Sequence, residues 1–236
     1  MKRYTVLLAA ATLAACGQSG DAPLTSLEGD VQTASYAIGY RTGQQMQGRT
    51  DDLDIDAFVA GLRAGAKGQT DGLLLPEEDM DEALVAYQQA QYEKMQGEMR
   101  ERGAANREAG DQFRAENAAR DEVTTLESGL QYEVLESGDG DSNPTLEDTV
   151  RAHYHGTLVD GTVFDSSVER GEPATFPLAH VIEGWQEALQ LMSVGDKWRI
   201  VIPPDLAYGD QEAGGRIPPG STLVFDVELL EIGVAE

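Results

Sequence analysis

Apolar and polar positions alternate most clearly between residues 181 and 209, where a helical period is followed by a strand period. Trp185, Leu189 and Met192 fall at i, i+4 and i+7, which places them on one face of a short helix. After a Gly195-Asp196 turn, apolar residues recur at every second position, as on a strand with one buried face. We therefore predict a short helix followed by a strand whose alternating positions are Trp198, Ile200 and Ile202.

A second strand is predicted upstream, over residues 150–155. Tyr154 shares one face of it with Val150 and Ala152, and His153 and His155 lie on the opposite face. A His-x-His pair on a strand can bind a metal ion, but the chain has only 3 histidines and no evident carboxylate or thiol partner for them. We therefore predict no metal site.

Two short helices are predicted in the N-terminal third. Ser26 and Asp54 are suited to cap them, because their side-chain oxygens can accept hydrogen bonds from the first helical amides. Neither helix has enough apolar residues for a core of its own, so we expect a second chain to cover their apolar faces. A small monomeric helical cap is the alternative. The two faces consist of Leu27, Val31, Ala34 and Ile38, and of Phe58, Leu62 and Ala66.

A long helix follows these two. Pro76 suits its first turn, and the absence of proline up to about residue 121 permits roughly 45 helical residues, or about 68 Å. Its second half is charged and rich in alanine, with Gly103 and Gly110 as weak points, so we expect that half to run through solvent. The stripe along its first half consists of Met80, Leu84, Tyr87, Gln91, Met95 and Met99.

Residues 1–15 have the features of a signal peptide. Lys2 and Arg3 precede about 12 apolar residues, which are too few to span a bilayer, since that takes about 20. Leu13-Ala14-Ala15-Cys16 then resembles a bacterial lipobox, in which the cysteine is acylated and becomes the new N-terminus. An ordinary signal peptide followed by a buried or reactive thiol is the alternative. Residues 16–25 would form a flexible tether.

Charge and composition exclude several functions. The chain has 42 acidic and 17 basic residues, a formal net charge of −25, which repels nucleic acid and anionic membrane surfaces. We therefore expect no nucleic-acid partner, and membrane association only through the lipid anchor. Nucleophilic catalysis is not predicted, because the sequence has no Gly-x-Ser-x-Gly turn to present a serine.

Several separated motifs resemble the FKBP-type peptidyl-prolyl cis-trans isomerases over roughly residues 145–232. They are Val163-Phe164-Asp165-Ser166-Ser167, Val181-Ile182-Glu183-Gly184-Trp185, Pro203-Pro204-Asp205-Leu206-Ala207-Tyr208-Gly209 and the run from Ile217 to Leu230. Residues 26–135 resemble the N-terminal part of the Mip/FkpA-like branch of lipoproteins in that family.

The resemblance implies an α+β fold. About five antiparallel strands would curl around the Trp185 helix in an isomerase domain of residues 123–236. Residues 26–75 would form a helical dimerisation region, and residues 76–122 a long connecting helix.

The resemblance also implies an apolar pocket with Trp185 as its floor. Asp165 would aim its carboxylate at the twisting bond or at a buried hydrogen-bond partner, and Arg170 would pair with it. The Tyr208 hydroxyl and the Ile182 backbone N–H would hold substrate carbonyls. The walls would be Tyr154, Phe164, Val181, Ile182, Ile217 and Phe225. Plain barrel core is the alternative for the apolar members.

Three positions depart from the commonest family pattern. Ala174 stands where some relatives have an aromatic wall, and Arg216 occupies a position that is often apolar, so both bear on substrate preference. Arg114, where relatives tend to be apolar, is expected to loosen the end of the long helix. Leu223 and Val227 are expected to be plain core.

The function implied is that of a lipid-anchored, homodimeric isomerase on the periplasmic face of a Gram-negative outer membrane. It would act without a cofactor on Xaa-Pro bonds of unfolded or exported proteins, and FKBP-type inhibitors would bind it. The alternative is a holdase chaperone, in which the N-terminal dimer cradles unfolded clients and isomerisation is secondary.

Overall fold

A computed structural model describes residues 25–47 and 53–233 of the chain. The chain divides between Glu78 and Asp79 into two compact units. The predicted signal peptide and Cys16 lie outside the described residues. Within the described ranges, none of the helices combines the length and the apolar composition that a membrane-spanning segment needs.

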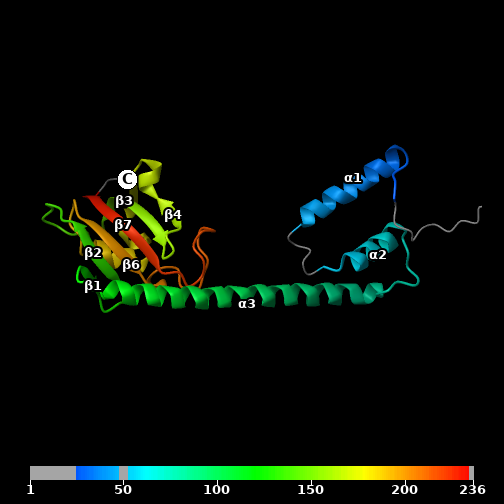
Figure 1. Ribbon diagram of the computed structural model, residues 1–236, viewed down its shortest axis with the longest axis horizontal. Helices are drawn as coiled ribbons and strands as arrows, with labels where there is room; N and C mark the ends of the chain where they lie inside the picture. The colour runs from blue at the N-terminus through cyan, green and yellow to red at the C-terminus, as the bar shows by residue number, and fades with distance from the viewer. Residues whose placement is uncertain (1–24, 48–52, 234–236) are drawn as a thin grey trace, which may run out of the picture. The chain divides into compact units, whose positions relative to one another are not determined.

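The first unit contains helices α1 (Gly29–Met46) and α2 (Ile55–Ala66) (Figure 1). Asp54 caps α2 as predicted, since its Oδ1 accepts a hydrogen bond from the Ala57 N–H at 2.9 Å. The cap predicted at Ser26 is wrong, because Glu28 occupies the N-cap position of α1 and makes no side-chain hydrogen bond there. Neither helix has a buried residue, and Leu62, for example, is 61% exposed.

The long helix α3 (Glu77–Ala118) has 42 residues, close to the predicted length. Its first half carries exposed apolar side chains, of which Leu84 is 59% exposed. Its second half does not run through solvent, so that expectation is wrong. Gly103, Gly110 and Asn117 are buried at seven-residue intervals, because that face of the helix packs against the domain that follows.

Arg114 ties the end of α3 to that domain instead of loosening it. Its Nη1 donates to Thr222 Oγ1 at 2.6 Å, and its Nη2 pairs with Asp111 at 2.5 Å. An apolar residue at this position could only pack, whereas the guanidinium finds a hydroxyl acceptor in Thr222.

Beyond α3 the chain folds into an antiparallel sheet with short helices (Figure 1). The strands are β1 (Val123–Thr125), β2 (Gln131–Glu136), β3 (Thr149–Leu158), β4 (Val163–Ser166), β5 (Ala174–Pro177), β6 (Lys197–Ile202) and β7 (Leu223–Ile232). The short helices are α4 (Ser167–Arg170), η1 (Leu178–His180), α5 (Glu183–Leu189) and η2 (Pro204–Leu206). The α+β class is confirmed.

The strand order is β1-β2-β6-β7-β3-β4, with β5 also paired to β3. The described residues thus form seven strands where about five were expected. The difference arises because β4 and β5 share one edge of the 10-residue β3, and because β1 is only 3 residues long.

Alternation along β3 and β7 builds the core. Val150 and Ala152 are fully buried on β3, and Leu223 and Val227 are fully buried on β7, as expected of plain core residues. Helix α5 lies against this face and contributes Trp185, which is 4% exposed. The predicted short helix and its alternating partner strand are confirmed as α5 and β6, although α5 ends at Leu189, so that Met192 is buried beyond the end of the helix.

Candidate active site

A cavity of about 730 Å³ opens in the second unit, beside α5 and the segment that joins β6 to β7. Most of the predicted site residues line it: Tyr154, Phe164, Asp165, Val181, Ile182, Trp185, Tyr208, Ile217 and Phe225. Arg170 does not line the cavity but pairs with Asp165. Residues from β3, β4, β7, α5 and the β6–β7 segment therefore line one cavity.

Edge-to-face aromatic contacts form the inner wall. The centroid of the Trp185 ring lies 5.4 Å from that of Tyr154 and 5.3 Å from that of Phe225. The Phe164 and Phe225 centroids are also 5.3 Å apart, and the ring planes of all three pairs are close to perpendicular. This geometry is favoured because the positive edge of one ring meets the negative face of another. Gly156 on β3 leaves room for it, since a Cβ there would overlap the Phe164 and Phe225 rings.

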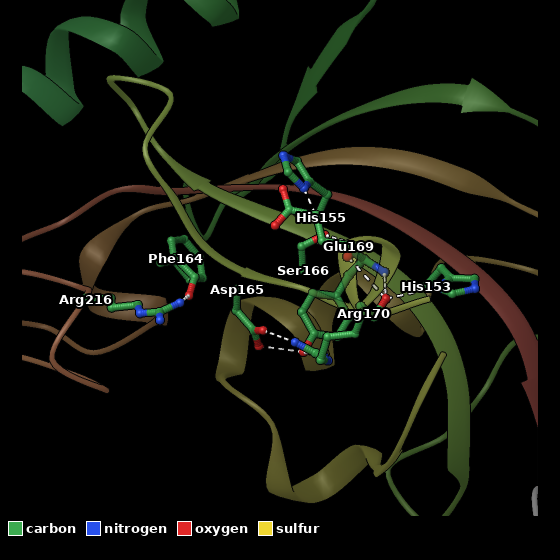
Figure 2. Close-up of polar contacts among 10 residues, drawn as sticks. His153, His155, Phe164, Asp165, Ser166, Glu169, Arg170 and Arg216 are labelled. Carbon is green, nitrogen blue, oxygen red and sulfur yellow. Dashed lines mark hydrogen bonds and ion pairs between the residues drawn. The ribbon is translucent and has the colours of Figure 1, made fainter. Parts of the chain in front are cut away.

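A polar cluster closes one side of the pocket. The Tyr154 hydroxyl donates to Asp165 Oδ2 at 2.6 Å and accepts from Arg170 Nη2 at 2.8 Å. Arg170 Nη1 also forms an ion pair with Asp165 Oδ1, and Figure 2 shows the two side chains facing each other. The three groups form a closed triangle, so the carboxylate is held in one orientation.

The same contacts set the protonation states of Asp165 and Tyr154. Burial raises the pKa of Asp165, but the hydrogen bond from Tyr154 and the Arg170 guanidinium outweigh it and bring the pKa below its usual range. Burial and the neighbouring Asp165 carboxylate together raise the pKa of Tyr154. At neutral pH the pair is therefore a carboxylate and a neutral phenol.

Each of the two histidines on β3 forms a hydrogen bond with a serine hydroxyl. His153 Nδ1 lies 3.0 Å from Ser167 Oγ, and His155 Nδ1 lies 3.0 Å from Ser166 Oγ (Figure 2). Ser167 Oγ also accepts from the Tyr154 N–H at 2.8 Å, so these contacts fix the start of α4 against β3. No cluster of three His, Cys, Asp or Glu residues suited to a metal ion occurs in residues 25–47 and 53–233.

Some lining residues were not predicted: Phe176, His180, Ala213 and Gly214. Arg216, which was expected to bear on substrate preference, also lines the cavity. The centroid of the Phe176 ring lies 5.7 Å from that of Trp185. Phe176 thus supplies an aromatic wall two positions after Ala174, on the same strand. The alternation along this strand could have found it. Arg216 donates from Nη1 to the Phe164 carbonyl at 3.4 Å and is otherwise exposed (Figure 2).

Two hydrogen-bond donors of the pocket are unused. Among the described residues, neither the Ile182 backbone N–H nor the Tyr208 hydroxyl has an acceptor, and Tyr208 is 42% exposed. An apolar floor with two free donors at its rim can bind a peptide that has an apolar ring between carbonyl groups.

Comparison with known proteins gives the family. FKBP-type peptidyl-prolyl cis-trans isomerase matches residues 140–230, and the domain amino terminal to FKBP-type peptidyl-prolyl isomerase matches residues 31–134. The chain is 46% identical to the FKBP-type 22 kDa peptidyl-prolyl cis-trans isomerase of Escherichia coli K12 over 200 residues, which cover 84% of this chain and 94% of that protein. The chain belongs to the FKBP-type peptidyl-prolyl cis-trans isomerases.

Two further similarities put this FKBP-type isomerase in the Mip/FkpA-like branch. It is 38% identical over 232 residues to the outer membrane protein MIP of Legionella longbeachae, with 98% of this chain and 97% of that protein covered. The crystal structure of FkpA from Escherichia coli superposes with a TM-score of 0.75 at 36% identity and covers 89% of this chain and 100% of that one. The predicted family and enzyme class are confirmed.

Proposed function

We propose that the aromatic pocket is the active site of this FKBP-type isomerase and works mainly by excluding water. Rotation about an Xaa-Pro bond is opposed by amide resonance, a barrier of about 18–20 kcal/mol. The twisted transition state loses resonance and charge separation, so an apolar pocket binds it better than it binds the planar ground state. A gain of about 5 kcal/mol would accelerate the reaction several thousandfold.

The observation that carries this proposal is the convergence of aromatic walls on Trp185 below two unused donors. Trp185 would contact the proline ring, and Phe164 and Phe225 would exclude water beside it. The Ile182 N–H and the Tyr208 hydroxyl would each donate to a substrate carbonyl. No cofactor is required, because no bond is made or broken.

Two substitutions that each remove one phenol hydroxyl test the assignment. Tyr208→Phe should lower kcat/KM for a proline peptide about tenfold, which corresponds to the loss of one hydrogen bond in the transition state. Tyr132→Phe is the matched control, because Tyr132 stacks on Trp198 outside the cavity and should leave the rate unchanged. Isomerisation can be followed by NMR exchange, and an FKBP-type inhibitor should abolish it. Catalysis that persists at saturating inhibitor would contradict the proposed site.

We further propose a homodimer on the periplasmic face of the outer membrane, anchored through acylated Cys16. Residues 26–75 would form the dimerisation region, residues 76–122 the connecting helix and residues 123–236 the isomerase domain. The open apolar faces of α1 and α2 support the dimer, and the similarity to an outer membrane protein supports the location. Mass spectrometry of the protein from its host membranes tests the anchor, and an unmodified Cys16 would refute it.

A holdase chaperone remains the second candidate, favoured by the exposed apolar residues of the helices. Unfolded exported proteins would be the clients in either case. Phe164→Ala separates the two functions, because it should remove isomerisation without touching α1 or α2. Unchanged protection of a denatured client against aggregation, measured by light scattering, favours the holdase; lost protection favours the isomerase.

A further inference from the structure

The C-terminal half of α3 makes close contact with the segment that carries part of the pocket. Gly103, Gly110 and Asn117 are spaced by two helical turns and therefore lie on one side of the helix. A Cβ at Gly110 would overlap Thr222 Oγ1, and a Cβ at Gly220 would overlap the Gly103 carbonyl. The glycines thus let the helix backbone approach residues 203–222 (Figure 1).

Arg107, on the same side of α3 as the two glycines, binds a carboxylate before and a carboxylate after Tyr208 in the sequence. Its Nη2 donates to Asp205 Oδ1 and its Nε to Asp210 Oδ1, each at 2.8 Å. The neighbouring Asn106 donates from Nδ2 to the Pro219 carbonyl at 2.8 Å. A guanidinium can hold two carboxylates at once because its donors form a rigid planar fork.

The segment held in this way carries several groups of the pocket. Tyr208 and Ile217 both line the cavity, and so does Arg216. Within the segment, the Gly209 N–H donates to the Pro204 carbonyl and the Gly220 N–H to the Gly209 carbonyl, each at 2.8 Å. These bonds shape the segment internally. Its position depends on its two ends, on the packing of Leu206 and Ile217 against the domain core, and on α3.

We propose that Arg107 is a positioning residue for catalysis, which holds residues 205–210 so that the Tyr208 hydroxyl meets the substrate carbonyl. The long helix would then be part of the active-site scaffold in addition to its connecting role. This inference rests on the proposed function of Tyr208. Both carboxylates are largely exposed and the Arg107 side chain is 33% exposed, so we expect a modest effect, about three- to tenfold in kcat/KM.

The test compares Arg107→Ala with Arg102→Ala in the full chain. Arg102 is an exposed residue of the same helix without an ion pair among the described residues, so both variants remove one positive charge from the same helix. Arg107→Ala should lower kcat/KM for a proline peptide about three- to tenfold, and Arg102→Ala should change it less than about twofold. Arg107→Lys should restore the rate in part, because an ammonium ion lacks the planar fork that reaches both carboxylates.

Two further readouts separate positioning from general stability. Amide hydrogen exchange of residues 205–221 should become about tenfold faster in Arg107→Ala, and that of β7 should not change. In a Tyr208→Phe background, Arg107→Ala should cause no additional loss of activity, because the group that it positions is gone. An equal loss in both backgrounds would overturn the proposal, as would a variant indistinguishable from Arg102→Ala in rate and exchange. If Tyr208→Phe alone kept full activity, the proposed role of Tyr208 would fail, whatever the exchange data showed.

Discussion

In the two halves of α3, burial is the opposite of what amino-acid composition suggests: the apolar half is exposed and the charged half is partly buried. The first half has large apolar side chains that are exposed, with Leu84 and Tyr87 among them. The second half is charged and poor in apolar residues, yet Gly103, Gly110 and Asn117 are buried. Because a surface is buried only where a partner fits it, side-chain hydrophobicity alone does not locate the contacts of this helix.

The difference also separates two kinds of stabilisation. The second half uses small residues and specific polar contacts, such as the hydrogen bond from Asn117 Nδ2 to Gln131 Oε1 at 2.9 Å. The first half, like α1 and α2, has apolar area that this chain leaves exposed, which typically marks an interaction site. One helix therefore has an internal partner at its end and exposed apolar area near its start, where we propose that a second chain binds.

The largest effect is expected where the external partner is removed. The full chain should be a dimer at micromolar concentration by sedimentation. Phe58→Asp should raise the dimer dissociation constant at least about a hundredfold, because it would bury a charge in the apolar interface. Isomerisation of a short peptide should not change, since no residue of α2 lines the pocket.

Asp56→Ala is the control for this variant, because it changes the charge by one unit on the opposite face of α2. It should leave the dimer intact. A wild-type chain that stays monomeric at micromolar concentration would overturn the proposed dimer.

The next largest effect concerns the pocket, where we expect apolar surface to dominate over a polar group. Asp165→Ala keeps the aromatic walls and removes the carboxylate, so kcat/KM should fall by about ten- to a hundredfold, or 1.4–2.7 kcal/mol. Asp226→Ala is the control, because it breaks the ion pair with Arg199 outside the cavity. Complete loss of catalysis in a folded Asp165→Ala variant would show that electrostatics, and not exclusion of water, dominates.

The contribution of Asp165 to stability depends on pH with a defined sign. The folded pKa of Asp165 is depressed, so its contribution to stability is present above the unfolded value of about 3.9 and is lost as pH falls through the folded value. The carboxylate therefore stays ionised near neutrality. The ratio of kcat/KM between wild type and Asp165→Ala should be constant from about pH 5 to pH 8.

A smaller effect tests the two halves of α3 directly with the same substitution. Gly97→Ala should stabilise the fold by up to about 1 kcal/mol, because alanine is the better helix former and a Cβ there meets open space. Gly110→Ala should destabilise it by about 1–2 kcal/mol, because overlap with Thr222 exceeds the gain in helix propensity. Urea unfolding measures both. Equal shifts of the same sign would mean that the second half of α3 is not in close contact with the domain.

The sequence predicted the pocket better than it predicted the contacts of α3, for a physical reason. The helical period marked Trp185 as buried, and Phe164 and Tyr208 stand in local motifs that resemble those of the family. Glycine has no side chain to produce such a signal, and the groups that meet Gly103 and Arg107 lie about 100 residues further along the chain. Helix composition therefore suggested solvent exposure where tertiary contact occurs.

The set of pocket residues predicted from the sequence was incomplete for a related reason. The aromatic wall was expected at position 174, where this chain has alanine, whereas the alternation of β5 carries Phe176, the next residue of that face, into the pocket. Arg216 was recognised as unusual, but its contact with the Phe164 carbonyl joins two segments about 50 residues apart and has no local signature.

The smallest expected effect comes from Arg216, a cation at the rim of an apolar pocket. The described residues offer it no ion-pair partner, and its one hydrogen bond, to the Phe164 carbonyl, is long at 3.4 Å. An acidic residue next to the substrate proline could therefore pair with it, and an exposed pair contributes about 0.2–1 kcal/mol, or roughly 1.4- to 5-fold in rate. We expect Arg216→Gln to lower kcat/KM for a Glu-Pro peptide by that factor and to leave the matched Gln-Pro peptide unchanged. Because a neutral amide keeps a hydrogen-bond donor at the rim, an equal loss for both peptides would mean that Arg216 shapes the pocket and does not select charge.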